Sequence, residues 1–260
     1  MMRVPDGHTR LIGIIGDPTG HIRGFTEYAA ALAARGANAA YLPFHVHPAD
    51  FAAFVAGLRG LRNLAGLVAT IPHKLAAFQV GEPDATARLA GSANMLRPTP
   101  TGWQAGNVDG PGFVLAARAA GMTIAGARVQ LLGAGGAGRA VAMAIAAESP
   151  TALAIHDTDA SRAENLARAV TKAFPDLATR VALEDSSLLV NASPVGMGSD
   201  ARLPCPAALV PGPGGAVYDI VNRADTPLVV LARQKGAASD HGYSMMAAEI
   251  PLILDWMLGP

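Results

Sequence analysis

A glycine-rich turn in the middle of the chain is the first segment whose residue types could do chemistry. The apolar run 129–132 leads directly into Gly133-Ala-Gly135-Gly136-Ala137-Gly138, and an alanine-rich segment follows. Between a strand and a helix, these glycines allow a tight turn, close approach of the backbone to a pyrophosphate, and close packing of helix on strand. The first N–H groups of the helix would bind the phosphates. The turn therefore predicts dinucleotide binding.

An acidic residue is expected about 20 positions beyond such a turn, where it hydrogen-bonds the ribose of the nucleotide. Asp157 stands near that position, directly after a second apolar run, 152–155. This second run and its aspartate favour the nucleotide, because a glycine pattern alone is weak evidence in a chain with 29 glycines. The alternative is that Asp157 only caps a loop or the next helix.

An enzyme that uses a nicotinamide also needs a group that exchanges a proton beside the hydride acceptor. Lys74 follows Thr70-Ile-Pro72-His just after a third apolar run. It falls in the first turn of a predicted helix, where the helix dipole favours the neutral amine. Asp109 and Asn94 are the other candidates before the turn. Each has an ordinary alternative: a solvated surface lysine, a helix cap and an asparagine that satisfies local backbone groups.

Composition narrows the class of protein. The 260 residues are 51% hydrophobic, and 20 Lys+Arg balance 20 Asp+Glu, which gives no electrostatic case for nucleic acid or an anionic membrane. The single cysteine, Cys205, excludes an intrachain disulfide and a Cys-based metal cluster. The N-terminus lacks the apolar core of a signal peptide, and no apolar run approaches 18 residues. We therefore expect a soluble cytoplasmic protein without a bound metal.

Apolar runs alternate with helical segments along the chain, which predicts α/β architecture with parallel sheets. Strands are expected at 11–16, 39–44, 64–69, 129–132, 152–155, 187–190 and 216–220, a hairpin at 93–96 and 103–105, and helices at 25–34, 48–60, 109–120, 140–147, 227–233 and 244–257. We predict an N-terminal α/β substrate domain with a mostly parallel sheet, residues 1–108 plus 237–260. A Rossmann-type dinucleotide-binding domain would span residues 109–236.

Seven motifs in order make the chain resemble the shikimate/quinate dehydrogenase family over nearly its full length. They are Gly13-x-x-Gly16-Asp-Pro18-x-x-His21, Thr70-Ile-Pro72-His-Lys74, Ala90-Gly91-Ser-Ala-Asn94, Asn107-Val-Asp109-Gly110, Gly133-Ala-Gly-Gly-Ala-Gly138-Arg, Asn191-Ala-Ser-Pro-Val-Gly196-Met197 and Tyr218-Asp219. The resemblance implies an NAD(P)-dependent dehydrogenase that acts reversibly on a ring CH–OH group of a shikimate- or quinate-like substrate. The chain would be a divergent, shikimate dehydrogenase-like member.

The resemblance also implies residue roles. Lys74 and Asp109 would be the catalytic pair, with Lys74 exchanging the hydroxyl proton and Asp109 orienting it. Thr70 and Asn94 would contact the substrate. The cofactor would contact the turn residues Gly133, Gly135, Gly136, Ala137 and Gly138, the residue Asp157, the loop residues Asn191, Ser193, Pro194, Val195 and Met197, and Gly242.

Departures from the family pattern concern the substrate. The family binds the substrate carboxylate with two hydroxyl side chains, and here those positions hold Ile22 and Gly24, with Arg23 between them. Asn222 replaces a pocket tyrosine, and Glu249 replaces a glutamine on the last helix. Hydroxyl donors are lost and an anion is gained, so a carboxylate would be disfavoured unless Arg23 binds it. We expect shikimate to be a poor substrate compared with an uncharged or amino-bearing cyclic polyol.

The resemblance also bears on the cofactor. NADP-using relatives place an arginine after the second strand of this domain, and here Asp157 and Asp159 would repel a 2′-phosphate. Arg162 falls inside the next predicted helix. We therefore predict NAD, with NADP less favoured, and a cyclic hydroxy compound as the only partner of a monomer or homodimer. The alternatives are the same chemistry on a different cyclic polyol, or a non-catalytic NAD-binding regulatory protein.

Overall fold

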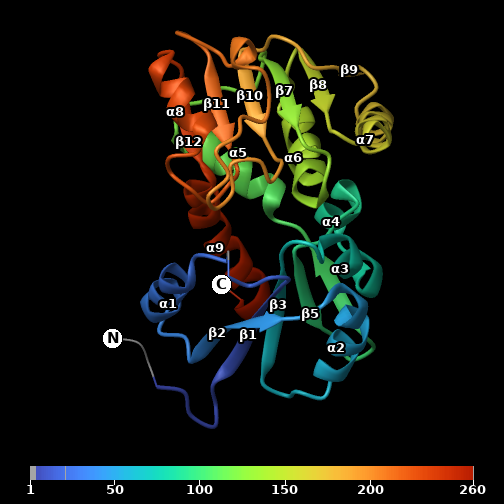
Figure 1. Cartoon of the computed structure of the whole chain (residues 1–260). Coiled ribbons are helices and arrows are strands. Elements are labelled where there is room, and N and C mark those ends of the chain that lie inside the picture. The colour runs from blue at the N-terminus through green and yellow to red at the C-terminus, as the bar shows by residue number, and fades with distance from the viewer. Residues whose placement is uncertain (1–3, 21, 260) are drawn as a thin grey trace. The chain divides into compact units, whose positions relative to one another are not determined.

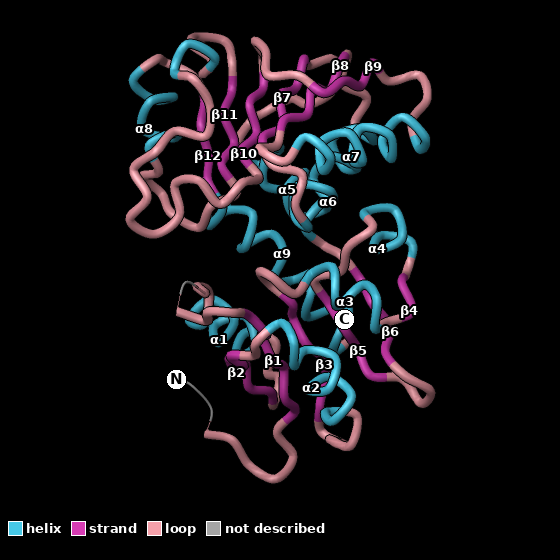
Figure 2. Tube along the Cα trace, turned by 45° about the vertical axis from the view of Figure 1, so that its right-hand side comes forward, coloured by secondary structure: helices cyan, strands magenta, loops and turns pink. Residues whose placement is uncertain are grey.

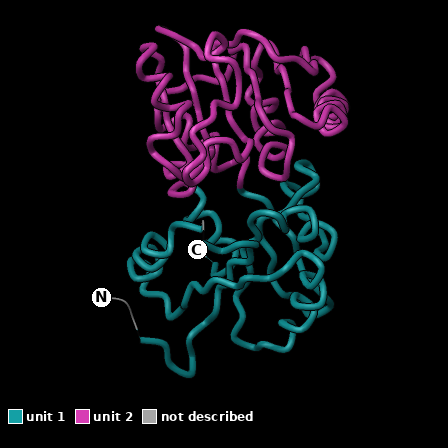
Figure 3. Tube along the Cα trace, viewed as in Figure 1, with its two compact units in different colours: residues 1–108, 249–260 teal, residues 109–248 magenta. Residues whose placement is uncertain are grey.

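The chain folds into two compact units, which are described one at a time. The computed structural model describes residues 4–20 and 22–259, so His21 of the first motif lies outside the described residues. Unit 1 comprises residues 1–108 and 249–260, and unit 2 comprises residues 109–248 (Figure 3). The chain re-enters unit 1 at residue 249, not at the expected residue 237, because segment 238–241 pairs with a strand of unit 2.

Unit 1 is built on a six-stranded mixed sheet with the order β2-β1-β3-β5-β6-β4 (Figure 1, with β4 and β6 labelled in Figure 2). The strands are β1 Arg10–Gly16, β2 Ala39–His45, β3 Leu64–Ala69, β4 Glu82–Pro83, β5 Met95–Pro98 and β6 Trp103–Gly106. Strand β1 runs parallel to β2 and β3, whereas β5 is antiparallel to β3 and to β6, which forms the expected hairpin. The helices are α1 Phe25–Ala34, α2 Phe51–Leu58, α3 Lys74–Val80 and α4 Ala85–Ala90, and the 3-10 turn η1 Pro48–Asp50 precedes α2.

Successive side chains of a strand point to opposite faces of a sheet, so the apolar runs supply two buried faces. On one face, Ile15 and Leu67 are fully buried and cluster with Phe51 and Val55 of α2. On the other face, Gly66 has no Cβ because Met257, near the end of the last helix, lies against it. That helix, α9 Gly242–Leu258, begins in unit 2 and ends in unit 1.

Unit 2 is a parallel six-stranded sheet with the order β12-β11-β10-β7-β8-β9 (Figure 2). The strands are β7 Arg128–Leu132, β8 Ala152–His156, β9 Ala178–Val181, β10 Leu188–Asn191, β11 Ala216–Asp219 and β12 Ala238–His241. The helices are α5 Asp109–Ala119, α6 Gly136–Ala147, α7 Ala160–Ala173 and α8 Pro227–Gln234, with a 3-10 turn, η2 Ala207–Leu209. The strand order reverses between β7 and β10, as in the doubly wound dinucleotide-binding fold, where ligands bind at the carboxyl ends of the strands at that reversal.

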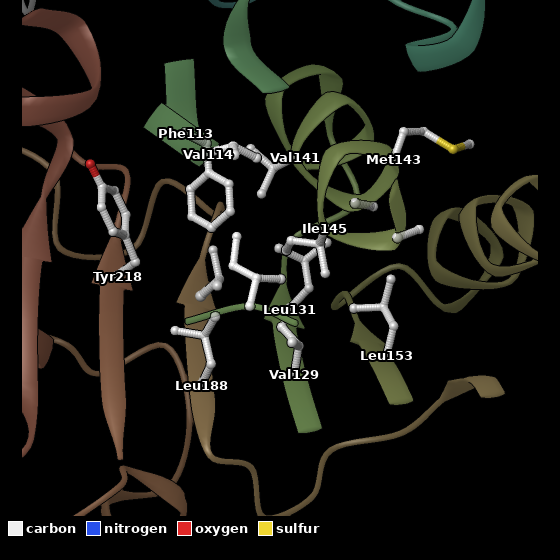
Figure 4. Close-up of a cluster of buried hydrophobic side chains, with 14 of the residues drawn as sticks. Phe113, Val114, Val129, Leu131, Val141, Met143, Ile145, Leu153, Leu188 and Tyr218 are labelled. Carbon is white, nitrogen blue, oxygen red and sulfur yellow. The ribbon is translucent and has the colours of Figure 1, made fainter. Parts of the chain in front are cut away.

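The core of unit 2 lies on both faces of this sheet. On one face, Leu131 and Leu188 pack with side chains of α5 and α6, such as Phe113 and Ile145 (Figure 4). The ring of Tyr218 on β11 meets Phe113 edge-on, with centroids 5.1 Å apart. On the other face, Leu189 packs with side chains of α8. The expected α/β class with mostly parallel sheets is confirmed. Among the described residues, no helix is both long and apolar enough to cross a membrane.

Candidate active site

The glycine turn joins β7 to α6, and each of its glycines meets a different surrounding. Gly133 has φ +99°, and a Cβ there would lie 2.7 Å from the backbone nitrogen of Ser193. A Cβ on Gly138 would overlap the carbonyl oxygen of Gly133. Gly135, at the N-cap of α6, has nothing within 4 Å of its Cβ position. Two glycines are therefore required for packing, whereas Gly135 opens backbone at a helix N-terminus, which fits a phosphate group.

Asp157 lies directly after β8, and both of its carboxylate oxygens accept backbone hydrogen bonds. Oδ2 accepts from the N–H of Ala134 at 2.7 Å, and Oδ1 accepts from the N–H of Asp159 at 2.9 Å. Asp157 therefore ties the end of β8 to the glycine turn. Asp159 caps α7 by accepting from the N–H of Ser161, and its contact with Ser161 lowers the pKa of its carboxyl.

The loop after β10 is shaped by the side chain of Asn191, which is fully buried. Its Oδ1 accepts from the N–H of Ser193 at 3.0 Å and from the Ser193 hydroxyl at 2.7 Å, and its Nδ2 donates to the carbonyl of Val195 at 3.1 Å. The N–H of Met197 donates to the carbonyl of Pro194. The expected cofactor residues of this loop thus form one hydrogen-bonded turn at the carboxyl end of the sheet.

Gly242 and Asn222 lie together at the same end of unit 2. A Cβ on Gly242 would lie 2.7 Å from Oδ1 of Asn222 and would overlap the carbonyl oxygen of Ile220. The N–H of Gly242 donates to the carbonyl of Val221. Gly242 is therefore required for the close approach of the α9 start to the segment after β11.

Thr70, His73 and Lys74 follow β3 in unit 1. The N–H of Thr70 donates to the carbonyl of Ile15, and the carbonyl of Thr70 accepts from the N–H of His73 at 2.7 Å. His73 is buried, its Nε2 lies 2.8 Å from the carbonyl oxygen of Val46, and its ring stacks on Phe51. Burial lowers the pKa of the His73 imidazole. His73 therefore anchors the turn, and Lys74 is the first residue of α3.

Asn94 holds the backbone of the residue that precedes Asp109. The side-chain oxygen of Asn94, which is 3% exposed, accepts from the N–H of Val108 at 3.0 Å. Asn107 donates to the carbonyl and hydroxyl of Ser92. Val108 is the last residue of unit 1 before Asp109, which is 2% exposed and begins α5. Lys74 and Asp109 thus belong to different units.

Ile22, Arg23 and Gly24 depart from the family pattern, and Ile22 lies with Thr70 beside Gly16 in unit 1. Ile22 is buried, and at Gly16 a Cβ would lie 3.2 Å from Cδ1 of Ile22 and 2.9 Å from Cγ2 of Thr70. Gly24 has φ +92° at the start of α1, a conformation that a serine would adopt only with strain. The guanidinium of Arg23 donates to the carbonyls of Gly20 and Ile22.

The charge of Glu249 on α9 acts on two tyrosines of unit 1, the buried Tyr28 and the half-buried Tyr41. The rings of Tyr28 and Tyr41 are stacked, with centroids 3.8 Å apart and planes 8° from parallel. Burial raises the pKa of both phenols, and the Glu249 carboxylate raises each further. The negative charge of Glu249 therefore acts on a part of unit 1 where solvent screens charges poorly.

Comparison with known proteins gives relatives over the full chain. A family model described as the shikimate dehydrogenase substrate binding domain matches residues 14–96. A curated relative, shikimate dehydrogenase (NADP(+)) of Acidiphilium cryptum, is 39% identical over 96% of this chain and 91% of its own length. The enzyme of the same name from Rubrobacter xylanophilus is 37% identical over 94% and 90%. The structure of shikimate 5-dehydrogenase from Listeria monocytogenes with shikimate and NAD has TM-score 0.87 at 25% identity, covering 100% of this chain and 95% of that one.

The expected preference for NAD is wrong by these comparisons, because the curated relatives are named for NADP(+). The prediction rested on the charge of Asp157 and on its place after β8. In the structure, that carboxylate binds the N–H groups of Ala134 and Asp159, so its presence is explained without a ribose. The Tyr218-Asp219 motif by itself indicates no role for Asp219. Its burial and its contact with Asn191 depend on the tertiary structure.

Proposed function

The chain belongs to the shikimate dehydrogenase family, and on that premise we propose that it interconverts a ring hydroxyl and a ketone on a shikimate-like substrate with NADP. It is a nicotinamide-dependent dehydrogenase that acts on a CH–OH group. The observation that supports the finer proposal is that the sequence holds all four residues of the family's pattern, Lys74, Asp109, Thr70 and Asn94. A non-catalytic nucleotide-binding protein would have no need of both members of the Lys74–Asp109 pair.

For the cofactor, the open backbone at Gly135 and the start of α6 would hold the pyrophosphate, and the loop 191–197 would border the nicotinamide. The bound nicotinamide supplies or accepts the hydride. Arg162 is the cation that we assign to the 2′-phosphate, since it lies in the first turn of α7 just beyond β8. Its side chain is 64% exposed, and its Nε lies 3.3 Å from Oδ2 of Asp159.

For the proton, the amine of Lys74 would take it from the substrate hydroxyl during oxidation and return it during reduction. Asp109 would stabilise the ammonium form of Lys74 and accept a hydrogen bond from a neighbouring substrate hydroxyl. Asn94 would bind a further hydroxyl, and its rotamer is fixed because its oxygen already accepts from Val108.

The substrate that fits best has no carboxylate at the corner formed by Ile22, Gly24 and Thr70. Ile22 brings a methyl group beside the methyl group of Thr70 where the family would place a hydroxyl. Arg23 is bound to two backbone carbonyls, and the negative charge of Glu249 acts on Tyr28 and Tyr41 of the same unit. A carboxylate would lose its hydrogen-bond donors at this corner, whereas an uncharged or cationic group would not.

Steady-state kinetics on the purified protein tests the proposal. NADP reduction is measured with shikimate, with its neutral carboxamide and with quinate, and each assay is repeated with NAD. We expect turnover with NADP and a lower KM for the carboxamide than for shikimate. A micromolar KM for shikimate that the carboxamide does not match would contradict the altered carboxylate site. No hydride transfer to any of these compounds would contradict the proposed reaction.

A further inference from the structure

Asp219 is a fully buried carboxylate at the end of β11 that the proposed reaction does not use. Its Oδ1 accepts from Nδ2 of Asn191 at 2.9 Å and from the N–H of Val221 at 3.1 Å. Its Oδ2 accepts from the hydroxyl of Thr226 at 2.7 Å. The side chain is 0% exposed, so it cannot touch a ligand. A carboxylate enclosed by three donors orients its neighbours.

One neighbour of Asp219 shapes the loop 191–197. Asn191 gives one amide hydrogen to Asp219 and donates also to the carbonyl of Val195, while its oxygen holds the N–H and hydroxyl of Ser193. An asparagine amide has a fixed pattern of two donors and one acceptor. The contact with Asp219 therefore fixes which way the amide faces, and through it the conformation of Ser193 and Val195.

The other neighbour fixes the segment that follows β11. The Thr226 hydroxyl donates to Asp219 and accepts from the N–H of Val229, which caps α8. On the outside, Arg223 donates to the carbonyls of Gly198 and Asp200 at 3.0 and 3.3 Å. The segments 191–200 and 219–226 are thus joined twice, once by the buried Asp219 and once by the half-exposed Arg223.

We propose that Asp219 is a positioning residue for the cofactor, which it serves by holding Asn191 and Thr226 so that the loop 191–197 keeps its binding conformation. This inference rests on the proposed function, because it takes that loop to border the nicotinamide. In this proposal Asp219 controls the affinity for the cofactor, whereas Lys74 and Asp109 serve the proton transfer to and from the substrate hydroxyl.

Two pairs of variants test this role. Asp219→Ala and Thr226→Val remove the contacts, whereas Asp219→Asn and Thr226→Ser keep the shape and the hydrogen-bonding capacity. We expect the first two to weaken NADP binding roughly tenfold, with kcat at saturating NADP within about twofold of the parent. Binding is followed by calorimetry, and folding by thermal unfolding. Asp176→Ala, which removes an exposed carboxylate of unit 2, is the matched control.

The outcomes separate the possible explanations. If the contact-removing variants lower the unfolding temperature but bind NADP as tightly as the parent, Asp219 is purely structural and the inference is overturned. Equal loss of affinity in Thr226→Val and Thr226→Ser would overturn it also, since the hydroxyl would then be irrelevant. Should Asp219→Ala fail to fold, the Thr226 pair decides alone. Binding of NADP and NAD to the parent protein is measured before any variant is made. If the parent binds neither, the proposed function itself is contradicted.

Discussion

The side-chain oxygen of Asn94 accepts a hydrogen bond of 3.0 Å from the backbone N–H of Val108, one residue before Asp109. A residue assigned to the substrate therefore also holds the backbone that leads into Asp109. The ordinary interpretation of Asn94, that it satisfies a local backbone group, is confirmed for its oxygen. The contact of Asn94 with the substrate stays a prediction.

Replacement by alanine is expected to affect cofactor binding at Gly135 and stability at Gly138. Gly138→Ala would place a Cβ on the carbonyl oxygen of Gly133, so it should lower the free energy of unfolding by about 2 kcal/mol or more. Gly135→Ala meets nothing within 4 Å and should fold normally. It should nevertheless raise the KM for NADP, because the methyl group would occupy the space proposed for the pyrophosphate. Chemical denaturation and cofactor titration of both variants measure the contrast, and normal NADP binding by Gly135→Ala would contradict the proposed phosphate site.

Lys74→Ala is expected to lower kcat by roughly 10²- to 10⁴-fold, the usual contribution of a general acid–base group. Its Kd for NADP should be unchanged, because the cofactor is assigned to unit 2. The measurement combines turnover at saturating substrate with calorimetric titration of NADP. Lys172→Ala, at an exposed lysine of α7, is the matched control. Full activity in Lys74→Ala would remove Lys74 from the mechanism.

Arg162→Ala separates the two cofactors. If Arg162 meets the 2′-phosphate, its loss should raise the KM for NADP roughly tenfold and leave the KM for NAD unchanged. Arg168→Ala, two turns further along α7, removes an exposed arginine of similar surroundings and serves as control. An equal rise in the KM for NADP and for NAD would show that Arg162 stabilises α7 and does not bind the 2′-phosphate.

Strands with continuous apolar runs could be predicted, because a short run of apolar residues by itself indicates a buried strand. The run 64–69 is β3 residue for residue, and 152–155 differs from β8 by one residue. β12 is different: Ala-Ser-Asp-His is polar and only partly buried, and it becomes a strand because β11 offers it a parallel edge. That pairing keeps residues 237–248 in unit 2, which a local pattern could not predict.

In the candidate site, too, some features could be predicted from the local sequence and others depend on the tertiary structure. Spacing located the glycine turn, since its requirements are set by neighbouring backbone, and Gly133 and Gly138 have the close contacts expected. The hydrogen-bond partners of the buried or partly buried carboxylates could not be predicted from the sequence. Asp157 binds Ala134 and Asp159, and Asp219 lies buried against Asn191, 28 residues away in the chain. Both acids are explained by contacts that exist only in the folded sheet.

Glu249→Gln tests whether the charge of Glu249 acts on the bound substrate. Removal of the carboxylate should lower the KM for shikimate roughly fivefold, because a like charge is lost in a poorly solvated region. The KM for the neutral carboxamide should not change. Asp255→Asn on the same helix breaks an ion pair with Arg35 and controls for charge loss on α9. A rise in KM for both compounds would mean that Glu249 binds a hydroxyl common to them.

The buried Asp219 predicts a specific pH dependence of stability. Burial raises the pKa of its carboxyl to about 6, above the value of about 3.9 expected in the unfolded chain. The folded state therefore holds its proton more tightly than the unfolded state. This group consequently favours folding most below about pH 4, and its contribution falls as pH rises to about 6. Two pKa units correspond to about 3 kcal/mol, an upper figure for this one carboxyl.

Asp219→Asn removes this titration while keeping an acceptor for Asn191 and Val221 and a donor for Thr226. Urea denaturation of the parent and the variant at intervals between pH 4 and 7 gives the difference in unfolding free energy. That difference should move in favour of the variant as pH rises from 4 to about 6 and stay level above it. A difference that is constant across the range would show that Asp219 titrates normally. A shift in the opposite direction would mean that Asn191, Val221 and Thr226 stabilise the charged form by more than burial disfavours it.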